Sequence, residues 1–478
     1  MLRIQLYLLA TLVALSSGAP SSSKSIAVVG TGYAGLAAVG RLRELGFDDI
    51  TVFEGADRIG GRVYSIPFGK GRLQQGAQWI NGKNNSIYRI ADELGLIIGE
   101  LADNEVFETA QYFDGNCGLT KELIDEYYNF TAPLPGEWEE LAEDKKNYAL
   151  TFDELYDEDY RKFLCRKKRS HREIALLGGL SRFYKAYFEG ENGAFEDYAL
   201  ANLEEWDDGE GEEKSYVLNE IGYYEVTNYL KKFVPDEIVK YGHFVRNINY
   251  AGEKVSIRIE ANNKHSIYPK KFDHVIVTSS LGHLKKYARS MFHPQLPHKK
   301  LEAIDTLGYG NLLKVFFVYD QPWWSYNGSA IAALRIKGCS KSPALMKYFH
   351  TFKTLEWGEN VLVAFVSATG TEMIDSVPDH VLSRMVTEHL RESMQVPDAP
   401  EPKKLIREHW VSNKLFLGAY SYIASESADL SGGAYNRMAE PVGSKIFFAG
   451  EATHPTMYQT TVGAYDSGVR EADRIAAL

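Results

Sequence analysis

The sequence predicts an α/β fold in which a parallel β-sheet alternates with helices. Three observations support this prediction: an apolar stretch that ends in a glycine-rich turn, a helical stretch after it, and a second apolar stretch that ends at an acid. The first stretch begins at Ile26, the turn spans residues 30–35, and the second stretch, residues 50–53, precedes Glu54. Strand, helix and strand in this order form a βαβ unit whose two strands run parallel.

Each glycine of this turn has a physical reason to be a glycine. Gly30 allows a tight turn, Gly32 lets a pyrophosphate approach the backbone, and Gly35 lets the helix pack closely against the strand. The helix that starts near Ala34 offers amide donors and the positive end of its dipole. Glu54 stands nineteen positions after Gly35 and is placed to accept hydrogen bonds from an adenosine ribose. The unit therefore predicts dinucleotide binding, with a turn that binds no ligand as the alternative.

Two further glycine-rich segments favour a flavin over a nicotinamide. Residues 58–62 read Arg-Ile-Gly-Gly-Arg, and Arg62 suits a diphosphate or the edge of an isoalloxazine ring. Near the C-terminus an apolar strand ends in Gly450 and Glu451, and a helix start rich in glycine and alanine follows at residues 461–472. Glycine-rich pieces at opposite ends of the chain can meet on one extended cofactor.

With these motifs the chain resembles the flavin-dependent amine oxidases, and among them most closely the animal polyamine oxidases. The matching segments follow one another in the same order over residues 25–478: 26–35, 58–62, 76–82, 310–317, 410, 418–422 and 446–464. The resemblance implies a Rossmann-type FAD-binding domain built from discontinuous segments plus an α+β substrate domain, which is the amine oxidase fold.

The expected domain limits follow from this resemblance and from local pattern. Residues 25–100, 238–299 and 405–478 are assigned to the FAD-binding domain, and residues 101–237 and 300–404 to the substrate-binding domain. The second FAD-binding segment is rich in alternating and buried-type strands, whereas the region from about 101 to 230 is helical and rich in charge.

The resemblance also implies the residues that contact FAD: Gly30, Gly32, Ala34, Gly35, Glu54, Arg62, Gln78, Trp79, Val245, Glu451, Thr460 and Thr461. Monoamine oxidases attach their flavin to a cysteine in a Gly-x-Tyr segment. Here that segment has Ala419 between Gly418 and Tyr420, so we expect noncovalent FAD.

Four residues are expected to bind substrate. Tyr420 matches one of the two tyrosines that frame the amine in monoamine oxidases, and Thr460 occupies the position of the other, so the cage is open on that side. Asn81 stands where vertebrate polyamine oxidases carry a histidine, and unlike histidine it does not titrate near neutral pH. Glu205 lies in the acidic run 204–213, which is either a solvated loop or a funnel for polycations.

Lys314 is the predicted catalytic residue. It lies in the apolar strand 312–317, where a charged side chain is costly unless it is paired or has a role. An edge-strand lysine that extends to solvent is the alternative. The resemblance implies that Lys314 holds a water near flavin N5 and assists reoxidation by O2.

The predicted reaction is the FAD-dependent oxidation of spermine, spermidine or an N-acetylated form to an imine, which hydrolyses to an aminoaldehyde and a shorter polyamine while O2 becomes H2O2. Two alternatives stay open: an oxidase of another primary or secondary amine, and a flavoprotein that has lost turnover. A net charge of −11 argues against nucleic acid as a partner and mildly favours cationic ligands. No spacing of cysteine and histidine suggests a metal site, and nothing in the sequence indicates an oligomeric state.

The N-terminus predicts entry into the secretory pathway. Arg3, an apolar run from Ile4 to Leu15 and small residues near Ala19 form the pattern of a signal peptide, residues 1–19. The run is too short to span a bilayer comfortably, and an uncleaved anchor is the alternative. The last three residues, Ala-Ala-Leu478, lack the basic middle residue of a peroxisomal signal.

The sequons of the chain are compatible with the same pathway, and its cysteines are few. Three sequons are present, at Asn84, Asn129 and Asn327. The only cysteines, Cys117, Cys165 and Cys339, allow at most one disulfide and leave at least one thiol.

Overall fold

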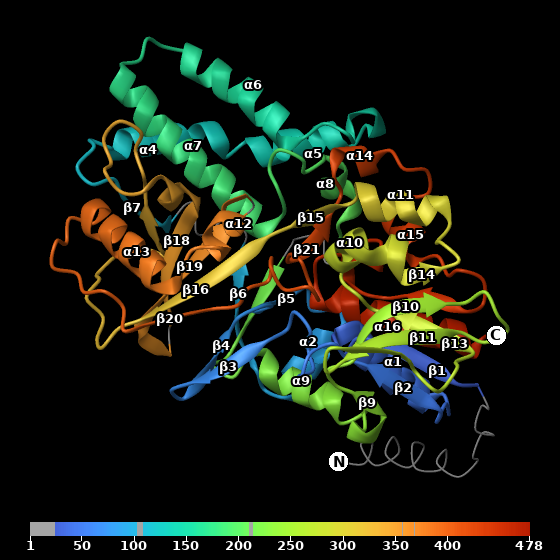
Figure 1. The fold of residues 1–478 in the computed structure, drawn as a ribbon. Coiled ribbons are helices and arrows are strands. Elements are labelled where there is room, and N and C mark those ends of the chain that lie inside the picture. The colour runs from blue at the N-terminus through green and yellow to red at the C-terminus, as the bar shows by residue number, and fades with distance from the viewer. Residues whose placement is uncertain (1–23, 103–108, 210–213, 356, 368) are drawn as a thin grey trace, which may run out of the picture.

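The computed structural model describes residues 24–102, 109–209, 214–355, 357–367 and 369–478 (Figure 1). The predicted signal peptide, residues 1–19, and the last four residues of the acidic run, 210–213, lie outside the described residues.

The predicted parallel sheet is present, and its strands come from three distant stretches of the chain. The strand order is β22-β13-β1-β2-β9, and every neighbouring pair is parallel. The bounds are β1 (Ile26–Val29), β2 (Ile50–Phe53), β9 (Val239–Lys240), β13 (His274–Val277) and β22 (Ile446–Phe448). The side chains of β1, β2, β13 and β22 are buried throughout, as expected for a parallel sheet covered on both faces. The α/β prediction is confirmed.

One face of this sheet is covered by α1 (Tyr33–Glu44), α16 (Thr461–Ala476), α2 (Ser86–Glu93) and α9 (Tyr223–Lys231), which share one hydrophobic core with it (Figure 1). The helices α1 and α16 touch through their backbones, because a Cβ on Gly468 would lie 2.1 Å from the carbonyl oxygen of Ala34. Two helices from opposite ends of the chain are thereby packed tightly together on this face of the sheet.

The other face carries a second core. It is formed with an additional sheet of order β12-β11-β10-β14 and three helices. The bounds are β10 (Phe244–Asn249), β11 (Ser256–Ala261), β12 (Lys264–Ile267), β14 (Phe292–His293), α10 (Leu281–Met291), α11 (His298–Thr306) and α15 (Ala434–Ala439).

A six-stranded sheet of order β20-β16-β19-β18-β17-β7 forms the other half of the molecule (Figure 1). Its pairs are antiparallel except β17 with β7. The bounds are β7 (Gln111–Phe113), β16 (Leu312–Val318), β17 (Ile331–Ala333), β18 (Phe349–Leu355), β19 (Gly358–Ser367) and β20 (Lys404–Arg407), with α12 (Thr369–Asp375) and α13 (Asp379–Ser393) beside them. The apolar run around Lys314 is an inner strand, β16, which pairs with β19 along its whole length and with β20 from Val315 onward. Lys314 is buried, which rules out the alternative of an edge-strand lysine that extends to solvent.

Helices of the charge-rich region lie over this sheet and over the junction of the two halves: α4 (Lys121–Thr131), α5 (Leu134–Ala142), α6 (Phe152–Cys165), α7 (His171–Glu191) and α8 (Ala201–Glu205). Sequence-encoded capping boxes begin α6 at Thr151 with Glu154 and α7 at Ser170 with Glu173.

Short elements connect the two halves. They are β3 (Ser65–Phe68) and β4 (Gly71–Gln74), the sheet of β5 (Trp79–Asn81), β8 (Lys214–Leu218) and β6 (Ile97–Ala102), the pair β15 (Gly308–Gly310) and β21 (Tyr420–Tyr422), and α14 (Ser425–Ala428).

Two elements depart from the expected domain limits. The helix α9 was expected in the substrate-binding segment 101–237, but Tyr223, Val226 and Leu230 pack into the core of the parallel sheet. The strand β20 begins before residue 405 and pairs with β16 of the six-stranded sheet, so that sheet continues into the segment assigned to FAD binding. In both places the element belongs with the sheet that its residues contact, and not with the segment in which the sequence places it.

Cys117 and Cys339 form a disulfide, and Cys165 is an exposed thiol. The bridge joins the segment before α4 to the loop after β17, which are 222 residues apart in sequence. Among the described residues, no helix combines the length and apolarity that a bilayer span requires.

Candidate active site

A single cavity of about 1100 Å³ extends from the glycine turn after β1 to the helices α5, α7 and α8. Its walls come from both halves of the molecule and include all three segments assigned to FAD binding. It brings together all of the predicted site residues except Gly35 and Glu205.

The glycine turn has the geometry that its sequence predicts. Gly30 adopts a φ of 108°, which a residue with a side chain rarely adopts, and a Cβ on Gly35 would lie 2.1 Å from the Gly30 carbonyl oxygen. A Cβ on Gly32 would meet nothing within 4 Å, because this residue faces the cavity. Gly35 therefore serves packing behind the wall, while Gly32 and Ala34 form the wall itself.

Two helix N-termini face the same cavity. The first turn of α1 carries no side-chain cap, and Gly32, Tyr33 and Ala34 line the wall. The first turn of α16 contributes Thr460 and Thr461. Together they place two positive dipole ends beside one space, an arrangement suited to an anionic pyrophosphate.

Glu54 lies at this end of the cavity and is almost completely buried. Its Oε2 accepts hydrogen bonds from the backbone amide and hydroxyl of Thr31, at 2.8 and 2.6 Å, and its Oε1 accepts one from the amide of Ala56, at 2.7 Å. A carboxylate has about four acceptor positions, so Oε1 retains one for a ribose hydroxyl. Val245 of β10 lines the adjacent wall.

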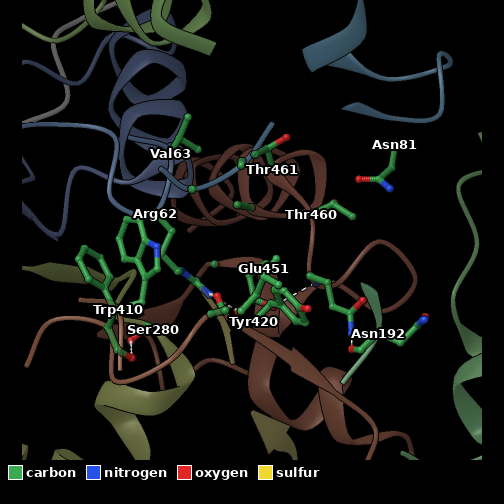
Figure 2. Close-up of a pocket in the computed structure, with 18 of the residues that line it drawn as sticks. Arg62, Val63, Asn81, Asn192, Ser280, Trp410, Tyr420, Glu451, Thr460 and Thr461 are labelled. Carbon is green, nitrogen blue, oxygen red and sulfur yellow. Dashed lines mark hydrogen bonds and ion pairs between the residues drawn. The ribbon is translucent and has the colours of Figure 1, made fainter. Parts of the chain in front are cut away.

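An ion pair between Arg62 and Glu451 connects the predicted segments at the centre of the cavity (Figure 2). Arg62 Nη1 lies 2.9 Å from Glu451 Oε1 and also donates to the carbonyl oxygen of Ala419. The other carboxylate oxygen of Glu451 accepts hydrogen bonds from the Ser421 hydroxyl at 2.6 Å and the Gln459 amide at 3.1 Å. The pair fixes the C-terminal Gly-Glu turn against the arginine of the second glycine segment.

Lys314 is buried and lines the cavity, and all three of its ammonium hydrogens have acceptors. Its Nζ lies 2.7 Å from the Gly76 carbonyl oxygen, 2.8 Å from Gln78 Oε1 and 3.4 Å from the Gln74 carbonyl oxygen. Burial lowers the pKa of Lys314 to about 7. A lysine with this pKa exchanges a proton near neutral pH, and the long contact to Gln74 is the one that a bound water can replace most easily.

Aromatic rings surround this lysine. The indole of Trp79 lies 5.3 Å from Nζ and stacks on Phe365 with 6.4 Å between ring centroids. Asn81 follows in the same strand, β5, and its side chain faces the cavity on the far side from Trp410 (Figure 2). Gln78, Trp79 and Asn81 thus form a continuous strip of wall.

Tyr420 and Thr460 both line the cavity but are held in different ways. The Tyr420 hydroxyl donates to the carbonyl oxygen of Gly190 at 2.9 Å, which fixes the ring at the end of α7. The Thr460 hydroxyl donates to the Met457 carbonyl oxygen and accepts from the Gly463 amide, so it caps α16. Thr460 therefore shapes the wall, and its donor is already used.

The outer part of the cavity is acidic and aromatic. It is lined by four acidic residues and one lysine, Lys214. The acidic residues are Glu204, Asp207, Asp208 and, from α5, Glu139. The aromatic wall consists of Tyr128, Trp138, Phe152, Tyr184, Tyr187, Phe188, Tyr198 and Trp206.

Glu205, the member of the acidic run predicted to bind substrate, does not line the cavity. Successive residues of a helix point about 100° apart, and at the end of α8 this rotation turns Glu205 away while Glu204 faces the opening. Burial raises the pKa of Glu205. The acidic mouth is present, but its members are the neighbours of the predicted residue.

Sequence reasoning missed the aromatic wall and Gln75. Rings spaced three or four residues apart on α7 have the spacing of ordinary core residues, so no signal separated them from the core. Gln75 is buried and lines the cavity, and neither end of its amide has a hydrogen-bond partner among the described residues. An unpaired buried amide at a cavity wall indicates a polar ligand.

A family model described as flavin-containing amine oxidoreductase matches residues 33–476. The chain belongs to this family. Its relatives include the peroxisomal N(1)-acetyl-spermine/spermidine oxidases of Bos taurus and Homo sapiens. Each is 28% identical; the alignments cover 96% of both chains for the bovine protein and 97% for the human one. Polyamine oxidase 1 of Oryza sativa subsp. japonica is also 28% identical, over 94% of this chain and 96% of that protein.

The fold of this amine oxidoreductase matches that of a putrescine oxidase solved with putrescine. The TM-score is 0.66 at 19% identity, with 95% of this chain and 99% of that chain covered. This likeness confirms the amine oxidase fold.

Family membership implies a flavin, and the residues present fit one. The glycine wall at Gly32 and the unpaired amide of Gln75 leave space and polar atoms for a dinucleotide. Arg62 and the start of α16 offer positive groups for the diphosphate and the ring edge. No cysteine lines the cavity among the described residues, and none of them forms a His, Cys, Asp or Glu cluster suited to a metal ion.

Proposed function

We propose that this flavin-containing amine oxidoreductase oxidises polyamines such as spermine, spermidine or an N-acetylated form, with O2 as the electron acceptor. The observation that carries the proposal is the single cavity that leads from an acidic, aromatic mouth past Lys314 to the glycine walls. A polycation is attracted by the carboxylates and its methylene segments pack on the rings. The polyamine oxidases among the relatives support the same substrate class.

The bound FAD would accept a hydride from the carbon beside the neutral amine nitrogen, loss of the N–H proton would leave an imine, and two electrons and two protons would then pass to O2 to give H2O2. The residues of the chain position the amine and exclude water from it. Trp79, Asn81 and Tyr420 hold the reacting segment, and the open side at Thr460 admits a secondary amine with carbon chains on both sides. Water hydrolyses the imine to an aminoaldehyde and a shorter polyamine.

Lys314 is proposed to act as the proton-exchanging group of the site. Its pKa of about 7 lets Nζ hold or release a proton at working pH, and its position among Gly76, Gln78 and Trp79 faces the reacting end of the cavity. A water in place of the long Gln74 contact would connect Nζ to the flavin side.

FAD is proposed to be held without a covalent bond. Ala419 lines the cavity in the segment where monoamine oxidases carry the linking cysteine, and its carbonyl oxygen is held by Arg62. Purified protein is therefore expected to be yellow and to release free FAD on acid or heat denaturation, as seen by flavin fluorescence in the supernatant. Flavin that sediments with the precipitated peptide contradicts this assignment.

A location in the secretory pathway is also proposed. The signal-like N-terminus motivates it, and the disulfide between Cys117 and Cys339 and the exposed sequon residues Asn84, Asn129 and Asn327 support it. Collection of the protein from culture medium, with a mass decrease on treatment with peptide N-glycosidase, is the expected result. Retention of an unglycosylated full-length chain in the cytosol contradicts it.

A peroxide-release assay over a panel of amines tests the activity. Spermine, spermidine and their N-acetylated forms are expected to give H2O2, and benzylamine and tyramine to be poor substrates. Faster turnover of benzylamine supports an oxidase of small amines instead. No peroxide from any amine, with FAD bound, supports a flavoprotein without turnover.

A further inference from the structure

The turn between α6 and α7 concentrates positive charge on a protein whose net charge is −11. Residues 160–172 contain seven lysines and arginines and no aspartate or glutamate: Arg161, Lys162, Arg166, Lys167, Lys168, Arg169 and Arg172. Figure 1 shows this turn at the outer end of the two helices, away from the parallel sheet. The cavity does not reach these residues, so they play no part in the site described above.

Some of these cations have structural partners. Lys167 and Arg169 pair with Glu126 at 2.9 Å each, and Lys162 pairs with Glu158 at 2.9 Å. The carboxylate of Glu173 is taken up by the capping box of α7. The acids nearest the turn are thus already committed to local contacts.

Four cations of the turn remain without such partners. Arg161, Arg166, Lys168 and Arg172 are exposed, and none of them makes an ion pair with any described residue. Holding like charges together in this way costs free energy unless a counter-charge is supplied from outside.

The disulfide adds a second basic segment to the same surface. Cys339 is bonded to Cys117. Gly118, which follows Cys117, lies against Arg172, since a Cβ added to Gly118 would be 2.7 Å from Arg172 Nη2. Further along α7, Arg182 donates to the carbonyl oxygen of Arg335 at 3.0 Å. The loop 335–341, with exposed Lys337 and Lys341, is therefore fastened along α7 beside the turn.

We infer that this surface, the basic tip, binds an extended sulfated polysaccharide. The basic tip consists of Arg161, Arg166, Lys168, Arg172, Lys337 and Lys341. Its cations are spread over the turn between α6 and α7 and the neighbouring loop 335–341, which fits a linear polyanion that contacts them in series. The choice of a sulfated polysaccharide as the polyanion rests on the secretory location proposed above; the binding of polyanions does not.

Two other polyanions fit less well. Single-stranded nucleic acid binds on exposed aromatic rings, but in residues 160–172 Phe163 is buried and Tyr160 is half-buried, stacked on Tyr156. A membrane surface is held by several apolar side chains that enter the lipid, but of Phe163, Leu164 and Ile174 only Ile174 is exposed. A flexible sulfated chain needs neither kind of anchor.

Heparin affinity of the complete, FAD-loaded protein tests the inference. Wild type is expected to be retained at 0.15 M NaCl, and the triple variant Arg166→Ala, Lys168→Ala, Arg172→Ala to elute at clearly lower salt. The slope of log Kd against log salt should decrease by about one for each cation that contacts the polyanion. A matched variant, Lys264→Ala, Lys271→Ala, Lys299→Ala, removes the same charge from exposed positions elsewhere and should bind as wild type does.

Three outcomes would overturn the inference: passage of wild type through the column at 0.15 M NaCl, equal losses in the two triple variants, or tighter binding to single-stranded DNA or phosphatidylserine vesicles than to heparin. Peroxide release is measured on the same preparations. Because the basic tip lies outside the cavity, loss of heparin binding with normal turnover is distinguishable from failure of the proposed oxidase function.

Discussion

Two buried lysines, one in each half of the molecule, have the same burial and different surroundings. Lys300 of α11 is 3% exposed and Lys314 of β16 is 4% exposed, and burial lowers the pKa of each to about 7. Lys300 donates to the carbonyl oxygens of Arg437 and Met438, both at 2.7 Å, and lies over the ring of Phe448. It thereby holds the C-terminal end of α15, whose last carbonyls have no partner within the helix.

Lys314 differs in what lies beyond its hydrogen bonds. It lines the cavity, whereas Lys300 does not. Its acceptors come from the strip of wall that holds Gln78 and Trp79. A perturbed pKa therefore marks a candidate catalytic residue only when the group also reaches a space where a substrate can lie.

Substitution of the two lysines by methionine should affect turnover very differently. Lys314→Met should bind FAD but release peroxide from spermine at least tenfold more slowly, a barrier increase of about 1.4 kcal/mol, because the group that exchanges protons at the cavity is lost. Lys300→Met is the matched control and should turn over at the wild-type rate per bound FAD. Equal losses in both variants would show that burial of a lysine, and not its place at the cavity, determines the effect.

Lys300→Met should instead lower the stability of the protein. Lys300→Met leaves the Arg437 and Met438 carbonyl oxygens without their donor, and we expect the free energy of unfolding to fall by about 1 kcal/mol at pH 7. The loss is small because the variant also removes a charge that is costly to bury. Denaturant unfolding at constant FAD concentration measures it. An unfolding curve identical to that of wild type would remove Lys300 from the account of α15.

The same lysine predicts a dependence of stability on pH. Its pKa is about 7 in the folded chain and about 10.5 when unfolded, so between these values the unfolded state binds more protons. The contribution of Lys300 to the free energy of unfolding should therefore rise from pH 7 toward pH 10 and be constant below about pH 7. The difference between wild type and Lys300→Met should widen as pH increases from 7 to 9. A difference that narrows over this range contradicts the direction of the shift.

The smallest effect concerns the acidic mouth. Glu204→Gln combined with Asp207→Asn should raise the KM for spermine by about twofold at low salt, since exposed charges contribute about 0.2–1 kcal/mol each. The effect should shrink at 0.15 M salt, where the Debye length is about 8 Å. Glu205→Gln is the control, because Glu205 does not line the cavity. A KM change in the control as large as in the double variant would restore Glu205 to the site.

The sequence predicted those parts of the site where backbone geometry restricts the residue type. Gly30 requires a positive φ, Gly35 has no room for a Cβ, and Glu54 follows its strand at a fixed distance. Each of them can therefore be recognised from residue type and spacing in the sequence. Contacts made across the fold leave no such pattern. Whether Glu204 or Glu205 faces the cavity depends on where each residue lies around the short helix α8, which has five residues. The rings of the aromatic wall on α7 have the spacing of ordinary core residues.

The same reasoning explains the two domain limits. The segment containing α9 reads as amphipathic helix and the segment containing β20 as a short strand, and neither pattern states which sheet the element will cover. Which sheet α9 or β20 contacts depends on the apolar surface that each can bury in the folded chain. Lys314 was found because a lysine inside an apolar run is improbable on any face of a buried strand.

The role of Lys314 in the reaction is tested in a stopped-flow spectrometer. Wild type, Lys300→Met and Lys314→Met are mixed anaerobically with spermine, and the reduced proteins are then mixed with O2. The loss of flavin absorbance reports oxidation of the amine, and its recovery reports reoxidation. We expect Lys300→Met to match wild type in both phases and Lys314→Met to be at least tenfold slower in one of them. Two phases that are unchanged in Lys314→Met would contradict the assignment of this lysine to the reaction.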